Sequence, residues 1–179
     1  MDGLACCGCG GRFAEVDGPT HPYMLSSPGC WACYGKVLAR QYVDYSGARD
    51  ILRLTVDAYA VQHPHAPSSQ NTRSIGFHLC RLCLLLERGL DASRADAAMA
   101  VISAHKSRFI PLPIPASLGE VTVADVHAAA SPERRLEIVR QWAAVAWEAW
   151  TPCHQVVRGW VAGIFPDAEP GAAAAGEGR

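Results

Sequence analysis

The stretch SPGCWACYGKVLARQY (residues 27–42) divides the chain into two parts of different character. Before it, residues 1–30 are rich in glycine, proline and cysteine and have no regular hydrophobic period, which indicates irregular structure. Within it, Ser27 followed by Pro28 is typical of a helix start, and apolar side chains then recur at helical spacing from Trp31 to Tyr42. The sequence therefore predicts a cysteine-rich lobe joined to a helical body.

The helical period continues through most of the remaining chain. Helices are expected to begin near residues 28, 50, 71, 95, 132 and 152, and Pro64 and Gly89 are expected to end two of them. Residues 121–123 are expected to form either a short strand or the approach to a helix cap at Asp125. We therefore predict a mainly α fold, in which a bundle of five or six helices over residues 31–165 packs against a metal-binding lobe over residues 1–30. Residues 166–179 are rich in Gly, Ala and Glu and are expected to be a disordered tail.

Composition restricts the class of protein. The chain has 179 residues, half of them hydrophobic, which is typical of a globular domain. Its 16 basic and 17 acidic residues leave no positive excess for a nucleic-acid backbone, so we expect no nucleic-acid partner. We see no secretory signal at the start and no long apolar run, so we expect a cytoplasmic protein without a membrane segment. Cytoplasmic cysteines stay reduced, and clustered ones therefore suggest a metal site before a disulfide.

The sharpest local signal is the run CCGCGG at residues 6–11. Cys6 and Cys9 have the CxxC spacing of a zinc knuckle, and a structural zinc needs four ligands in a closed tetrahedron. The other two ligands are either His21 and Cys30, which makes a Cys3His site, or Cys30 and Cys33, which makes a site of four cysteines.

Two other readings of the same cysteines stay open. Cys7 could replace one of its neighbours as a ligand. Cys6 and Cys9 could also be a redox dithiol, although no thioredoxin-like βαβ pattern surrounds them.

A second group of residues suggests a pocket in the helical body. Histidines on three predicted helices could converge there on a second transition metal, with a carboxylate orienting an imidazole and with basic or phenolic groups beside it. The candidates for catalysis on a small molecule are His63, His78, His154, Asp57, Tyr59 and Arg158. The alternative is that the histidines form a buried polar network, and that the protein is a zinc-stabilised binding or interaction module without catalysis.

Several motifs resemble a family of small bacterial proteins known only as a domain of unknown function. They are CxxCG at residues 6–10, DGPTHPY at 17–23, SPGCW at 27–31, TVDAYA at 55–60 with QHP at 62–64, and His78-Leu79. The resemblance spans roughly residues 6 to 161 and implies no activity. It does imply that Cys6, Cys9, His21 and Cys30 belong together, which favours the Cys3His set, and that His63, His78 and His154 belong to the family's motifs.

Overall fold

The computed structural model describes residues 3–44 and 49–166 and is mainly helical, as predicted. Its helices are α1 (Pro28–Asp44), α2 (Arg49–Gln62), α3 (Ser69–Leu82), α4 (Ala92–Ala104), α5 (Val123–Ala128), α6 (Pro132–Ala149) and α7 (His154–Ile164). Shorter elements are a π-helical turn η1 (Cys83–Glu87) and two 3-10 turns, η2 (Lys106–Arg108) and η3 (Thr151–Cys153). Two strands, β1 (Leu4–Ala5) and β2 (Arg12–Phe13), pair antiparallel. Nearly all of the tail that we expected to be disordered lies outside the described residues.

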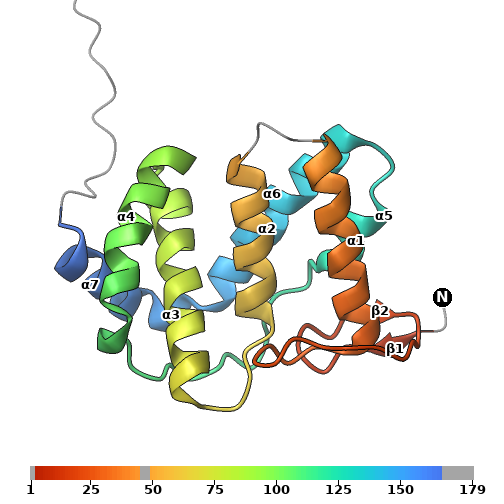
Figure 1. Cartoon of the computed structure of the whole chain (residues 1–179), viewed down its shortest axis with the longest axis horizontal. Helices are drawn as coiled ribbons and strands as arrows, with labels where there is room; N and C mark the ends of the chain where they lie inside the picture. Colours follow the sequence, from red (N-terminus) through yellow and green to blue (C-terminus); the bar gives the residue numbers. More distant parts are fainter. Residues whose placement is uncertain (1–2, 45–48, 167–179) are drawn as a thin grey trace, which may run out of the picture.

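Four helices, α1 to α4, stand side by side across the bundle (Figure 1). Helix α2 packs against α3 on one side and against α6, while α5 packs against α1 and α7 against α3. Trp142 and Trp150 are among the largest fully buried side chains, and Tyr59 of α2 is buried with them. The core therefore surrounds α2, and the cysteine-rich lobe lies at the lower end of α1 and α2 (Figure 1).

Helix starts follow the capping signals in the sequence. Ser131 caps α6 by accepting a hydrogen bond from the Arg134 backbone, with Pro132 in the first turn, as the Ser-Pro pair predicted. At residues 121–123 the structure has a helix cap and no strand. The cap is Thr122, and Asp125 is the third helical residue of a reciprocal capping box.

The end of α2 is fixed by buried hydrogen bonds to other parts of the chain. The Gln62 amide donates to the carbonyl oxygens of Leu118 at 2.9 Å and Val121 at 2.8 Å, and it accepts from the Trp142 indole at 2.7 Å. The Trp150 indole donates to the Val61 carbonyl at 3.1 Å. These bonds also fix the position of the next residue, His63, where the helical body faces the lobe. Among the described residues, no helix has both the length and the apolar character needed to cross a membrane.

Candidate metal centre

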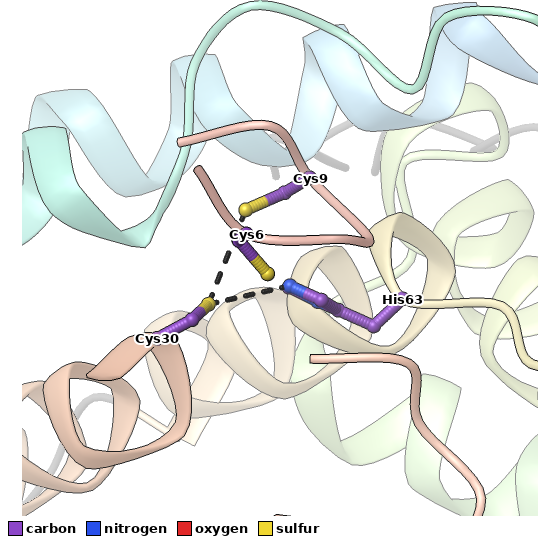
Figure 2. A group of neighbouring side chains, drawn as sticks. All are labelled: Cys6, Cys9, Cys30 and His63. Atoms are coloured by element: carbon purple, nitrogen blue, oxygen red, sulfur yellow. Dashed lines mark hydrogen bonds between the residues drawn. The ribbon is translucent and has the colours of Figure 1, made fainter. Parts of the chain in front are cut away.

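Cys6 and Cys9 lie in the tight loop that joins β1 to β2. The Cys6 backbone donates to the Gly11 carbonyl at 2.8 Å, and the Gly10 backbone donates to the Cys6 carbonyl at 3.0 Å. Gly10 has φ +72°, a conformation that favours glycine. This loop is the predicted knuckle, and it holds both thiols toward the helical body (Figure 2).

Gly8, between the two cysteines, touches the helical body directly. A Cβ atom at this position would lie 2.1 Å from the Leu25 carbonyl oxygen and 2.6 Å from Cδ2 of His63. Neither distance is compatible with a side chain, so glycine is required if the knuckle is to lie against the imidazole. The motif CxxCG thus contains a packing requirement as well as two thiols.

Cys30 comes from the first turn of α1. Its backbone N–H donates to the Ser27 hydroxyl at 3.3 Å, and the Ser27 backbone donates to Sγ of Cys6 at 3.4 Å. When Cys30 binds a metal as a thiolate, the positive end of the helix dipole stabilises its charge. Ser27 therefore caps the helix and also links Cys30 to the knuckle.

His63 supplies the fourth polar atom, from the residue that follows α2. Its Nδ1–H donates to the Tyr59 carbonyl at 2.6 Å, which leaves Nε2 unprotonated and aimed at the thiols. The Leu25 backbone donates to the His63 carbonyl at 2.9 Å, and Met24 forms a β-bridge with Pro64. This backbone pairing fixes His63 against the lobe. The bond to the Tyr59 carbonyl fixes the tautomer of its ring, as is usual for a histidine that binds a metal.

The four ligand atoms form a compact group. Sγ of Cys6, Cys9 and Cys30 and a ring nitrogen of His63 all lie within 4.8 Å of one another (Figure 2). Sγ of Cys9 and Cys30 are 3.9 Å apart, and Sγ of Cys30 is 3.4 Å from Nε2 of His63. Tetrahedral zinc with ordinary bond lengths places two sulfur ligands about 3.8 Å apart and a sulfur and a nitrogen about 3.5 Å apart. The chemistry and spacing of the group fit a single Cys3His metal ion.

The thiols influence one another's ionisation. Hydrogen bonds from Cys30 and Cys9 lower the pKa of Cys6 far below its ordinary value. The same contact with Cys6 raises the pKa of Cys30. For Cys9, the contact with Cys30 lowers the pKa, but the contact with Cys6 and burial outweigh it and raise the pKa to about 12. Without a cation, the cluster therefore favours one thiolate and two thiols.

Tyr59 supports the group from α2. Its hydroxyl lies 3.5 Å from Sγ of Cys30, and its ring stacks on His63 at 4.0 Å and on Tyr34 at 3.9 Å. Burial raises the pKa of the Tyr59 hydroxyl, so the hydroxyl is neutral and can donate to a thiolate. Tyr59 and His63 were both expected in the pocket of the helical body, and they lie together at the cysteine cluster.

His21, the expected fourth ligand, lies outside the group. Its ring contacts Tyr23 edge-on at 4.2 Å and Trp31 at 5.2 Å. The geometry therefore replaces His21 with His63 as the fourth candidate ligand. The family resemblance favoured His21, whereas His63 lies 33 residues beyond Cys30 in the chain and reaches the cluster because α2 ends beside the start of α1.

The two alternative cysteines also lie apart from the cluster. Cys33 is buried one turn further along α1, and its thiol lies 3.9 Å from the Val123 carbonyl. Cys7 is exposed. Neither belongs to the group of four, so the geometry favours the Cys3His set over the four-cysteine alternative.

The three histidines of the expected pocket do not share one site. His63 faces the thiols, whereas His78 pairs its Nδ1 with the Asp57 carboxylate at 2.7 Å. Asp57 is fully buried and also accepts from Nε and Nη2 of Arg81 at 2.7 to 3.0 Å. Asp57 thus orients an imidazole, as expected, but the imidazole is that of His78 alone.

His154 and Arg158 form a separate contact on α7. His154 stacks on Trp147 at 3.8 Å and pairs its Nε2 with the Trp147 carbonyl at 3.0 Å. Arg158 donates twice to Glu87, at 2.6 and 2.9 Å, which lowers the pKa of that carboxylate. His154 thus attaches α7 to α6 and Arg158 attaches it to η1, and neither residue is available to a pocket around His78.

A comparison with protein families gives a match over most of the chain. No curated protein matches the chain, and no solved structure does. A family model described as a family of unknown function, DUF5946, matches residues 4–151. That range contains all four residues of the metal-binding group together with His78 and Asp57. The chain belongs to the DUF5946 family, a family of unknown function.

Proposed function

We propose that the protein binds one zinc ion through Cys6, Cys9, Cys30 and His63, and that this zinc is structural. The observation that carries the proposal is the meeting of three sulfurs and one imidazole nitrogen at distances that suit a tetrahedral ion. The four residues come from the knuckle, the start of α1 and the end of α2, so one ion would connect the lobe to two helices.

A structural role is favoured over a catalytic one by the closure of the site. Catalytic zinc keeps one position open for water or substrate, whereas structural zinc has four protein ligands. Here four ligands are present, and Cys6, Cys30 and His63 are exposed by 3%, 0% and 1% of their surfaces. Bound zinc would stabilise the folded chain, because its binding free energy adds to that of folding.

The biochemical role we propose is a zinc-stabilised module that binds a small molecule. An open hollow of about 460 Å³, lined by His78 together with Arg73 and Lys106, supports the proposal of a small-molecule ligand. Within the described ranges, the thiol–imidazole group alone gathers three or more side chains of the metal-binding types. We therefore propose no second metal and no metal-dependent chemistry at His78.

The thiol chemistry also favours a reducing compartment, and we propose the cytoplasm. All eight cysteines are free thiols in the structure. Zinc binds thiolates, and oxidation of the cluster to disulfides would remove its ligands.

Elemental analysis of purified protein, without a metal-affinity tag or added metal, tests the zinc proposal. We expect one zinc per chain in the wild type, and in Cys30→Ser we expect much weaker zinc retention during dialysis against a chelator. Cys33→Ser is the matched control, since Cys33 is also buried on α1 but lies outside the cluster. Equal zinc retention by the two variants would contradict the proposed ligand set.

A further inference from the structure

An open hollow of about 460 Å³ lies beside the first three turns of α3. Its walls come from the lobe, from α3 and from η2, and include Tyr23, Gln70, Arg73, Phe77, His78 and Lys106. No acidic side chain is among the described residues that line it. The size is within the range of small-molecule sites.

Two cations at this hollow have no carboxylate partner among the described residues. Arg73 and Lys106 form no ion pair with any residue that the structure describes, in contrast to Arg81, which is paired with Asp57. The Lys106 ammonium lies 4.0 Å from the centre of the Phe77 ring, which places its charge beside the hollow. Arg73 and Lys106 also line a neighbouring hollow of about 430 Å³, so both charges stand where two depressions meet.

His78 gives the hollow a fixed polar atom. Its Nδ1–H donates to the buried Asp57 carboxylate at 2.7 Å, which leaves Nε2 as an acceptor. The His78 side chain is 13% exposed, so it is held rigidly yet reachable at the hollow. Arg81 balances the charge of Asp57, so the carboxylate does not cancel the positive field of the other two cations.

The start of α3 adds to the same field. Ser69 and Gln70 belong to its first turn and line the hollow. The first backbone N–H groups of a helix have no partner within the helix, and the helix dipole is positive there. Two cations, a helix N-terminus and an oriented imidazole thus line one depression. The first turn of α3 lies at the lower end of that helix (Figure 1).

We propose that this hollow binds a phosphate group carried by a small molecule. Arg73 and Lys106 neutralise the phosphate oxygens, and Nε2 of His78 accepts a hydrogen bond from a protonated phosphate oxygen. The rings of Phe77 and Tyr23 form an apolar wall for the organic part. This proposal specifies the class of small molecule that the zinc-stabilised module binds. It rests on the zinc proposal only because the folded lobe supplies Tyr23 to the hollow.

Titration of the full-length, zinc-loaded protein with inorganic phosphate and then with phenyl phosphate tests this site by ¹H–¹⁵N NMR. We expect shifts centred on residues 69–78 and Lys106, with a dissociation constant for inorganic phosphate of about 10 mM or lower and tighter binding of phenyl phosphate. Arg73→Gln and Lys106→Gln are each expected to weaken binding about tenfold, because each removes a charge-assisted hydrogen bond. The matched controls Arg94→Gln and Lys36→Gln remove the same charge from exposed positions outside the hollow and should bind like the wild type.

Each outcome either supports or overturns the site. Equal weakening by all four substitutions would show only a general charge effect and would overturn it, as would an absence of shifts at the hollow. Zinc content, measured on every sample, separates this result from the metal centre: a zinc-loaded protein that ignores phosphate refutes the hollow alone. A protein that takes up no zinc when zinc is supplied, and still binds phosphate at the hollow, refutes the zinc proposal alone.

Discussion

Replacement of Gly8 by alanine tests whether the knuckle packs directly on the imidazole of His63. The added Cβ would lie 2.1 Å from the Leu25 carbonyl oxygen and 2.6 Å from Cδ2 of His63, whereas ordinary contacts begin at 3.4 Å. The knuckle must therefore move away by roughly 1 Å, and zinc ligands tolerate displacements of only about 0.2 Å. We expect zinc affinity to fall about 10- to 100-fold, as when a supporting contact of a metal site is lost. Overpacking is expected to lower the free energy of unfolding by about 1–3 kcal/mol.

Competition with a chromogenic chelator measures the zinc affinity of Gly8→Ala, and urea unfolding with excess zinc measures its stability. Gly35→Ala is the control, because its Cβ would meet no atom within 4 Å on the exposed side of α1. That change should leave zinc affinity unaltered and should raise stability by up to about 1 kcal/mol, the usual gain in a helix. Wild-type zinc affinity in Gly8→Ala would refute the packing argument.

Three further predictions concern the surroundings of the centre. Tyr59→Phe removes the hydroxyl that lies 3.5 Å from Sγ of Cys30 but keeps the ring stack. Zinc affinity, measured by chelator competition, should therefore fall about tenfold, while the far-ultraviolet circular dichroism should not change. Unaltered zinc affinity would exclude Tyr59 as a supporting residue. Zinc binding should release about two protons near pH 7, because the pKa values of Cys9 and Cys30 are raised and that of Cys6 is lowered. Zinc affinity should therefore increase as pH rises. Calorimetry in buffers of different ionisation enthalpy measures the number of protons released, and a value of zero would contradict the prediction. Arg158→Ala should leave the affinities for zinc and for phosphate unchanged, since Arg158 is exposed and paired with Glu87. A loss of phosphate affinity in the NMR titration proposed above would instead place Arg158 at the phosphate-binding hollow.

Much of the helical architecture could be predicted because its signals are local. Ser131 with Pro132 marks the start of α6, and Gly89, with φ +61°, follows the end of the α3–η1 segment. The short helix α5 was expected only through one of two alternatives, a helix cap near Asp125, since its six residues are too few to show a hydrophobic period. The antiparallel pair β1–β2 was missed for the same reason, because each strand has two residues.

In the candidate site, too, the residues given by local sequence could be predicted, whereas the one brought in by helix packing could not. Cys6 and Cys9 follow from CxxC spacing, and Cys30 was a member of both ligand sets that the sequence allowed. His63 belonged to the expected pocket, and its assignment to the cysteine cluster depends on the packing of α2 against α1. No spacing rule contains that packing, and the position of His63 directly before Pro64 showed only that His63 stands at the end of α2.

The separation of His63, His78 and His154 has a related cause. Helical periodicity shows which face of its own helix a residue occupies but not which neighbour that face meets. His78 faces Asp57 of α2, and His154 faces Trp147 of α6. Convergence on one pocket required all three histidines to face the same point. In the structure they face three different partners: the thiols, Asp57 and Trp147.

The most direct test of the zinc centre is the zinc dissociation constant of His63→Ala beside that of His21→Ala. Both substitutions remove one imidazole near the lobe, so they match in chemistry and differ in the position of the ring. The proposed centre predicts that His63→Ala binds zinc at least 100-fold more weakly than the wild type and that His21→Ala binds it with unchanged affinity. Weakened binding in His21→Ala together with unchanged binding in His63→Ala would contradict the central claim.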